Sequence, residues 1–80
     1  MEKEAIFQII VKHTLEVIPE LESHEFKITD QLKELGANSV DRADITTMTM
    51  ETLELEVPLV ELFGAQNIED LVELFYAKKQ

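Results

Sequence analysis

The sequence has no cysteine and no tryptophan, and only 6% of its 80 residues are aromatic. Without cysteine the chain has no disulfide framework, no thiolate nucleophile and no cysteine-based metal site. Because 45% of the residues are hydrophobic, the core has to be filled mainly by Leu, Ile, Val and Met. No apolar run approaches the roughly 20 residues that span a bilayer, and no leader peptide is recognisable. We therefore expect residues 1–80 to form one soluble, cytoplasmic, monomeric domain.

Basic residues are also scarce. Seventeen Asp and Glu against seven Lys and Arg give a net charge of −10 with both histidines neutral. Between Ala43 and Ala77 there is no Lys or Arg, although acidic residues recur through that stretch. Such a chain repels phosphate backbones and anionic lipid headgroups, so nucleic acid and membranes are excluded as partners and a charged partner should be basic.

The spacing of apolar residues predicts four helical segments. The first covers residues 3–18 and is ended by Pro19. The second covers residues 39–53, the short third covers residues 58–63, and the last begins after Asn67, which caps it. This pattern predicts an all-α fold, a small four-helix bundle with a long first loop and a short third helix.

The predicted second helix has a broader apolar face than a single stripe. Its apolar residues are Val40, Ala43, Ile45, Met48, Met50 and Leu53. Either this helix packs on two sides within the domain, or part of its apolar surface is left exposed for a partner.

The connection between the first two helices is expected to pack against the bundle. It contains apolar residues that would be costly to leave in water: Phe26, Ile28, Leu32 and Leu35. Thr29 and Asp30 can cap a short turn over residues 31–35, and Gly36 supplies the left-handed residue that closes it.

Few residues offer catalytic chemistry. We expect His13 and His24 at the surface or at its boundary, and their spacing does not suit a metal site. Paired carboxylates are expected by chance in so acidic a chain. The segment from Asp41 lacks the glycine and the alternating ligands of a calcium loop, and Ser39 lacks the flanking glycines of a hydrolase. We therefore predict no independent enzyme activity.

Ser39 is the most informative single residue. Its hydroxyl can cap the second helix, which is worth about 1 kcal/mol. It also follows a glycine-bearing turn, and the free N–H groups of a helix start favour a phosphate. The residues alone leave two interpretations open, namely a modified serine or a plain helix cap in an unmodified acidic helical adaptor that binds a basic protein.

Residues 35–41 (LGANSVD) resemble the phosphopantetheine attachment motif of acyl carrier proteins. Residues 29–32 (TDQL) resemble the family's lead-in to that motif, and residues 54–58 (ELEVP) resemble its segment after the second helix. Residues 67–71 (NIEDL) are similar to the start of the family's last helix, so the resemblance covers nearly the whole chain.

The resemblance implies a carrier without turnover of its own. A phosphopantetheinyl transferase would move 4'-phosphopantetheine from coenzyme A onto Ser39, and acyl groups would be held as thioesters on that arm. A fatty-acid or a peptidyl carrier would use the same arm. Asn38 stands where the common motif has Asp, and Arg42 and Met50 also depart from many fatty-acid carriers.

Residues 38–44 (NSVDRAD), together with residues 61–68 (ELFGAQNI), resemble those of discrete carriers of polyketide and antibiotic biosynthesis. Among them the chain resembles donor carriers of β-branching cassettes, which hold an acetyl group for a hydroxymethylglutaryl-synthase-like enzyme. The implied partners also include acyltransferases and ketosynthases. The second helix would be the recognition element, and the expected partner contacts are Asp41, Arg42, Asp44, Met48 and Glu51.

The net charge of −10 makes the stability of the fold sensitive to salt. Physiological ionic strength shortens the Debye length to about 8 Å and screens the repulsion among the carboxylates. The thermal midpoint should therefore rise from low to physiological salt in calorimetry. An unchanged midpoint would contradict this prediction.

Overall fold

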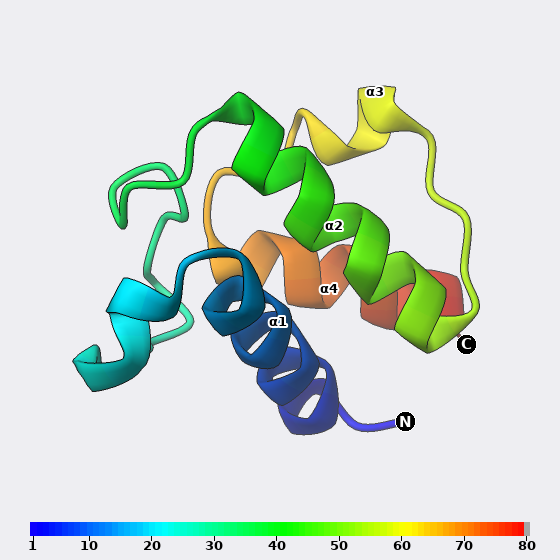
Figure 1. Ribbon diagram of the computed structural model, residues 1–80. Coiled ribbons are helices and arrows are strands. Elements are labelled where there is room, and N and C mark those ends of the chain that lie inside the picture. The colour runs from blue at the N-terminus through cyan, green and yellow to red at the C-terminus, as the bar shows by residue number, and fades with distance from the viewer. Residues whose placement is uncertain (80) are drawn as a thin grey trace.

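A computed structural model describes residues 1–79, and within them it contains helices and turns but no strand. The elements in chain order are α1 (Lys3–Val17), the 3-10 helix η1 (Pro19–Ser23), α2 (Ser39–Leu53), α3 (Leu59–Leu62) and α4 (Ile68–Lys79). Helix α1 packs against both α2 and α4, and the short α3 lies at one side of the bundle (Figure 1). The predicted all-α bundle with a long first loop and a short third helix is confirmed. No helix in the described part of the chain is long and apolar enough to cross a membrane.

The core is aliphatic apart from one aromatic ring, the fully buried Phe75. Leu32 and Ala37 belong to this core, so the connection before α2 is packed, as expected. The complete set of buried apolar residues is Ile6, Ile10, Leu32, Ala37, Ile45, Leu53, Val57, Leu62, Ile68, Leu71, Val72 and Phe75. All four helices and the long loop contribute to it.

The buried face of α2 differs from the predicted one. Val40 is 66% exposed and Ala43 is also exposed, whereas Thr46 and Thr49 are buried. The hydroxyl of Thr49 donates to the carbonyl of Ile45 at 2.8 Å, so its burial leaves no unpaired group. The apolar set expected for α2 was therefore wrong in part, because hydroxyls that bond to their own helix can replace apolar residues in the core. The sequence left open whether α2 packs on two sides or exposes part of its apolar surface. The structure shows that apolar residues at the N-terminal end of α2 are exposed.

His13 is buried, so the prediction of a surface or boundary position was wrong for this residue. Its Nδ1 lies 2.6 Å from Glu16 Oε1 and its Nε2 lies 2.7 Å from Thr52 Oγ1, which joins α1 to α2. Since a carboxylate only accepts hydrogen bonds, Nδ1 carries a proton. His24 is half-buried in the loop, as expected for a boundary position.

The carboxylate of Asp30 organises the first half of the long loop. It accepts hydrogen bonds from the amide of Lys27 at 2.8 Å and from Nε2 of His24 at 2.9 Å. It therefore bonds to residues before it, and the prediction that it caps the following turn was wrong. That turn does end at Gly36, whose φ of 99° lies in the left-handed region.

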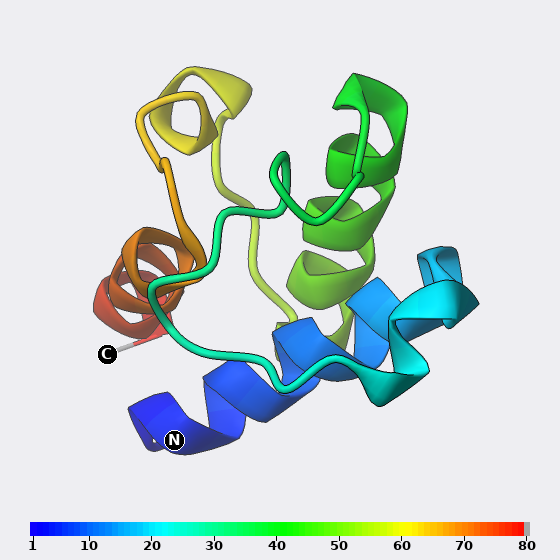
Figure 2. The ribbon, with the colours of Figure 1, turned by 90° about the vertical axis from the view of Figure 1, so that its left-hand side faces the viewer.

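The same loop is tied to the first turn of α4 through its backbone. The amide of Ile68 donates to the carbonyl of Asp30 at 2.9 Å, and the amide of Glu69 donates to the carbonyl of Ile28 at 2.8 Å. Figure 2 shows the loop running from η1 to this end of α4 and then to the start of α2. The loop thereby satisfies two amides that a helix start leaves without intrahelical partners, and it reaches α2 at a defined place.

The environment of Asp30 generates a prediction about pH. Burial raises the pKa of its carboxyl, but the hydrogen bonds from His24 and from the Lys27 amide lower it. The positive charges of the His24 and Lys27 side chains act in the same direction, so the pKa lies below the ordinary value of 3.8. The folded state thus favours the carboxylate, which stabilises the protein above that value and stops doing so as the pH falls through the lowered pKa. Asp30→Asn should reduce the free energy of unfolding by about 1 kcal/mol at neutral pH.

The measurement is urea unfolding of both proteins across a pH series. The difference between wild type and Asp30→Asn should shrink as the pH falls below the ordinary pKa of the carboxyl. Glu25→Gln, which removes an exposed carboxylate from the same loop, is the matched control and should show little effect. If Asp30→Asn is less stable than wild type by the same amount at all pH values, the carboxylate of Asp30 is not the group that stabilises the fold.

Candidate attachment site

The start of α2 is held by a reciprocal capping box. The side-chain oxygen of Asn38 accepts from the amide of Asp41 at 2.8 Å, and the carboxylate of Asp41 accepts from the amide of Asn38 at 3.2 Å. Asn38 is the N-cap and Ser39 is the first helical residue, so the prediction that Ser39 caps the helix was wrong. The spacing of an Asx residue and an acid three positions later is the sequence signal that indicates this box. Because Asn38 does the capping, the Ser39 hydroxyl is left exposed to solvent.

The approach to Ser39 is fixed by buried backbone contacts. Gly36 turns the chain with its positive φ, and the next residue, Ala37, is only 2% exposed. The amide of Ala37 donates to the carbonyl of Leu32 at 3.0 Å. Its carbonyl accepts from Nη1 of Arg42 at 2.6 Å, so a side chain of α2 holds the loop end. These contacts place Ser39 at an exposed corner of a rigid turn.

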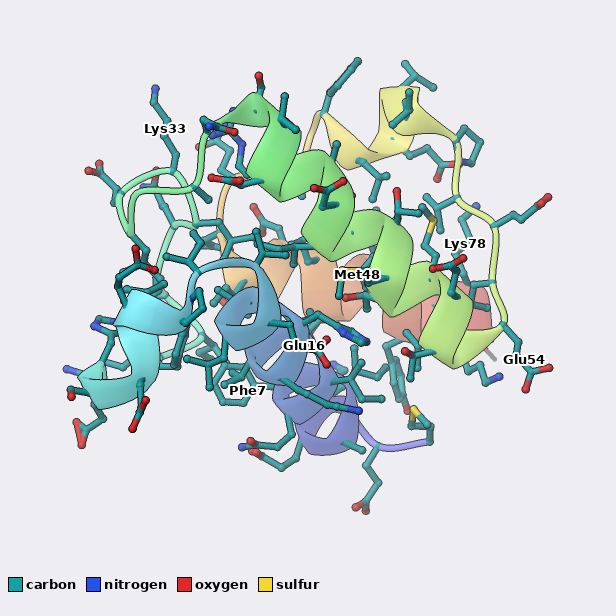
Figure 3. All side chains as sticks on the ribbon, in the orientation of Figure 1. Phe7, Glu16, Lys33, Met48, Glu54 and Lys78 are labelled. Atoms are coloured by element: carbon teal, nitrogen blue, oxygen red, sulfur yellow. The ribbon has the colours of Figure 1, made fainter. Side chains whose placement is uncertain are left out.

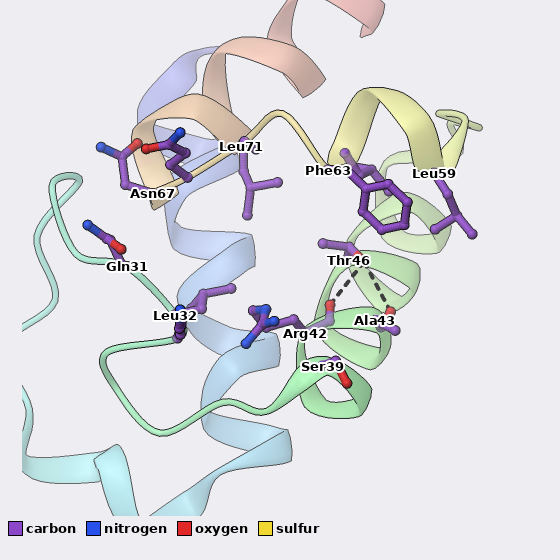
Figure 4. A pocket seen from close by; sticks show the side chains of 14 residues that line it. Gln31, Leu32, Ser39, Arg42, Ala43, Thr46, Leu59, Phe63, Asn67 and Leu71 are labelled. Atoms are coloured by element: carbon purple, nitrogen blue, oxygen red, sulfur yellow. Dashed lines mark hydrogen bonds between the residues drawn. The ribbon is translucent and has the colours of Figure 1, made fainter.

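Ser39 also lines a cavity of about 450 Å³ between α2, α3, the long loop and the start of α4. Figure 4 shows the side chains of Arg42 and Thr46 on the α2 side and those of Leu59 and Phe63 on the α3 side. The cavity therefore combines a guanidinium group with apolar and uncharged polar side chains next to an exposed hydroxyl.

The five expected partner contacts divide into two groups. Asp41 and Arg42 lie within one turn of Ser39, where the carboxylate belongs to the capping box and the guanidinium holds the loop. The other three lie further along α2, where Asp44 and Glu51 are exposed and Met48 is half-buried. Their role as partner contacts stays a prediction.

Helix α3 exposes apolar side chains that the sequence reasoning did not select. Val60 is 75% exposed and Phe63 is 79% exposed, while Leu62 anchors the helix in the core. The signal for this surface is the composition of residues 59–63, which hold four apolar residues, more than a single helical turn can bury on one side. Phe63 also lines the cavity beside Ser39, and Val40 is a further exposed apolar residue on α2.

The corner at Ser39 fits a covalently attached phosphate group. The first amides of a helix have no intrahelical partner, and the positive end of its dipole favours an anion. Arg42 and Lys33 are among the residues that line the adjacent cavity, so two basic residues border the space beside Ser39. Among residues 1–79 no group of three or more His, Cys, Asp or Glu is placed to hold a metal ion.

Comparison with known proteins assigns the chain to a family. The family model of the phosphopantetheine attachment site matches residues 10–75. The chain is 50% identical to the polyketide biosynthesis acyl-carrier-protein AcpK of Bacillus subtilis (strain 168), over all 80 of its own residues and 98% of that relative. It is also 51% identical to a chain in the crystal structure of the curacin biosynthetic pathway HMG synthase in complex with the acetyl donor-ACP. That match has a TM-score of 0.91 and covers 98% of this chain and 100% of the other.

The chain therefore belongs to the family of acyl carrier proteins with a phosphopantetheine attachment site. It is a carrier and not a catalyst, and its cofactor is covalently attached 4'-phosphopantetheine. Within the family it is similar to carriers of polyketide biosynthesis. The predictions of family, fold and cofactor are confirmed.

The two neighbouring residues at the start of α2 should respond differently to mutation. Asn38→Ala removes the acceptor for the Asp41 amide and should lower the free energy of unfolding by about 1 kcal/mol. Ser39→Ala should change it by less than about 0.5 kcal/mol, because the exposed hydroxyl does not cap the helix. Urea unfolding of the unmodified proteins measures both effects. A larger loss of unfolding free energy in Ser39→Ala than in Asn38→Ala would indicate that Ser39, and not Asn38, caps the helix.

Proposed function

We propose that the chain carries an acetyl group on a 4'-phosphopantetheine arm at Ser39 and donates it to a hydroxymethylglutaryl-synthase-like enzyme in polyketide β-branching. The observation that carries the proposal is the 51% identity, over essentially the whole chain, to a chain of the HMG synthase and donor carrier complex. Because the match covers 100% of that chain and 98% of this small one, the matched chain is the carrier and not the synthase.

The geometry of the α2 start supports Ser39 as the attachment residue. Its hydroxyl is exposed on the first turn of a helix, and Asn38 and Asp41 have taken over the capping. The arm supplies the thiol that this cysteine-free chain lacks, and a phosphopantetheinyl transferase would transfer it from coenzyme A. An unmodified adaptor would need neither the free hydroxyl nor the adjoining cavity.

The surface around Ser39 supports docking to enzymes with basic sites. Asp44 and Glu51 are exposed on α2, and no basic residue follows until after Ala77. Val40 and Phe63 add exposed apolar groups, which can hold a complex that charges have steered together. A carrier of an acetyl group must first receive it, so we include an acyltransferase or a ketosynthase-like enzyme among its partners.

The first test is the intact mass after incubation with coenzyme A, magnesium and a broad-specificity phosphopantetheinyl transferase. Wild type should gain one phosphopantetheine, and Ser39→Ala should gain none. Ser23→Ala is the matched control, because Ser23 is the only other serine of the chain, and it should load like wild type. No gain in folded wild type, or loading of Ser39→Ala, would contradict the attachment site.

A second assay tests the donor role. The chain loaded from acetyl-coenzyme A is mixed with a hydroxymethylglutaryl-synthase-like enzyme of a polyketide pathway. The acetyl group should be transferred to the enzyme, and the intact mass of the carrier should fall by the mass of that group. A peptidyl or fatty-acid carrier loaded in the same way should donate far more slowly. Equal rates for all carriers would contradict the assignment to β-branching.

A further inference from the structure

The cavity beside Ser39 differs in charge from the rest of the molecule. The chain has 17 acidic residues, yet none of them is among the residues that line this cavity, whereas Arg42 and Lys33 are. Lys33 is exposed and extends away from the bundle into solvent (Figure 3). Arg42, the only arginine of the chain, is partly buried, and Figure 4 shows it reaching from α2 toward Leu32 of the loop. The partly buried charge in this cavity is therefore the guanidinium of Arg42.

This guanidinium is anchored at one nitrogen. Nη1 donates to the carbonyl of Ala37 at 2.6 Å, and this is the one protein acceptor described for the group within residues 1–79. A guanidinium has five N–H donors in a fixed plane, so its remaining donors depend on water or on oxygen atoms of a ligand. Any group that enters the cavity has to leave that water in place or replace its hydrogen bonds.

The remaining walls carry no negative charge, and they combine apolar side chains with the uncharged amide side chains of Gln31, Gln66 and Asn67. Leu62 and Leu71 are apolar and nearly buried, and they would favour an alkyl chain by themselves. The hydroxyl of Thr46 already donates within α2, to the carbonyls of Arg42 and Ala43 at 3.0 and 3.1 Å. Arg42 is thus the partly buried charge that a hydrocarbon entering this cavity would meet.

We propose that Arg42 makes this cavity selective against long alkyl groups, so that only short acyl groups are accommodated beside Ser39 and longer chains stay in solvent. A long chain in the cavity would strip water from a cation without replacing its hydrogen bonds, which is strongly unfavourable. A short acyl group or an amide oxygen of the arm leaves the donors hydrated or accepts from them. The inference rests on the proposed function, because it concerns groups attached through Ser39, and it makes Arg42 a specificity residue.

The experiment compares acetyl and decanoyl forms of the same protein. Wild type, Arg42→Met and Lys33→Met are each loaded from acetyl- or decanoyl-coenzyme A, and their thermal midpoints are measured by calorimetry. Lys33→Met is the matched control, since it changes the net charge equally but alters an exposed side chain. In Arg42→Met the decanoyl form should melt roughly 6 to 13 °C above the acetyl form, the shift expected when about two methylene groups leave water in a domain of this size.

In wild type and in Lys33→Met the thermal midpoint of the decanoyl form should not exceed that of the acetyl form. A rise in wild type equal to that in Arg42→Met, or no rise in Arg42→Met, would overturn the inference. Each comparison is made within one variant, so a lower baseline stability of Arg42→Met does not affect it. Arg42→Lys keeps the charge and should behave like wild type, and a rise in that variant would also overturn the role of the charge.

Two further readouts complete the design. The methyl resonances of Leu62 and Leu71 in wild type should be the same in the acetyl and decanoyl forms, and shifts specific to decanoyl would place the chain in the cavity and overturn the inference even if Arg42→Met fails to fold. The intact mass of every sample reports loading. Absence of loading at Ser39 overturns the proposed function itself, whereas full loading with chain-length effects in wild type overturns only the role of Arg42.

Discussion

The capping of α2 by Asn38 is the interaction on which the site depends. Its side chain and that of Asp41 satisfy each other's backbone amides, which starts the helix without using Ser39. The preceding residue is held by the core and by Arg42, so the first turn is rigid while its serine remains exposed. A rigid, accessible hydroxyl at a helix N-terminus suits a residue that an enzyme has to modify with a phosphate group.

The distribution of charge separates stability from recognition. Exposed ion pairs such as Lys3 with Glu73 contribute little, so the apolar core has to overcome the repulsion within a chain of net charge −10. The last basic residues join helices instead, since Lys78 pairs with Glu61 of α3 and Lys79 donates to a carbonyl at the end of α2. Asp44 and Glu51 of α2 remain exposed to solvent.

Helix α3 has an exposed apolar side and an inner side that faces the cavity beside Ser39. It is a single turn anchored by Leu62, and it exposes Val60 and Phe63 to solvent. Leu59, Leu62 and Phe63 also line the cavity that contains Arg42, so this short element borders the space beside Ser39.

The sequence by itself determined the helices, the attachment motif and the acidic second half, because apolar spacing, turn residues and charge are local properties. The first and last helices fold as predicted, and Asn67 caps α4. Only the tertiary structure decided that His13 is buried against Thr52, that buried threonines replace apolar residues on α2, and that Arg42 turns into a cavity. His13 and Thr52 are 39 residues apart in the chain, so their contact cannot be read from local spacing. Which side of α2 is buried depends on how the helices pack together, and this packing overrides the local pattern of apolar residues.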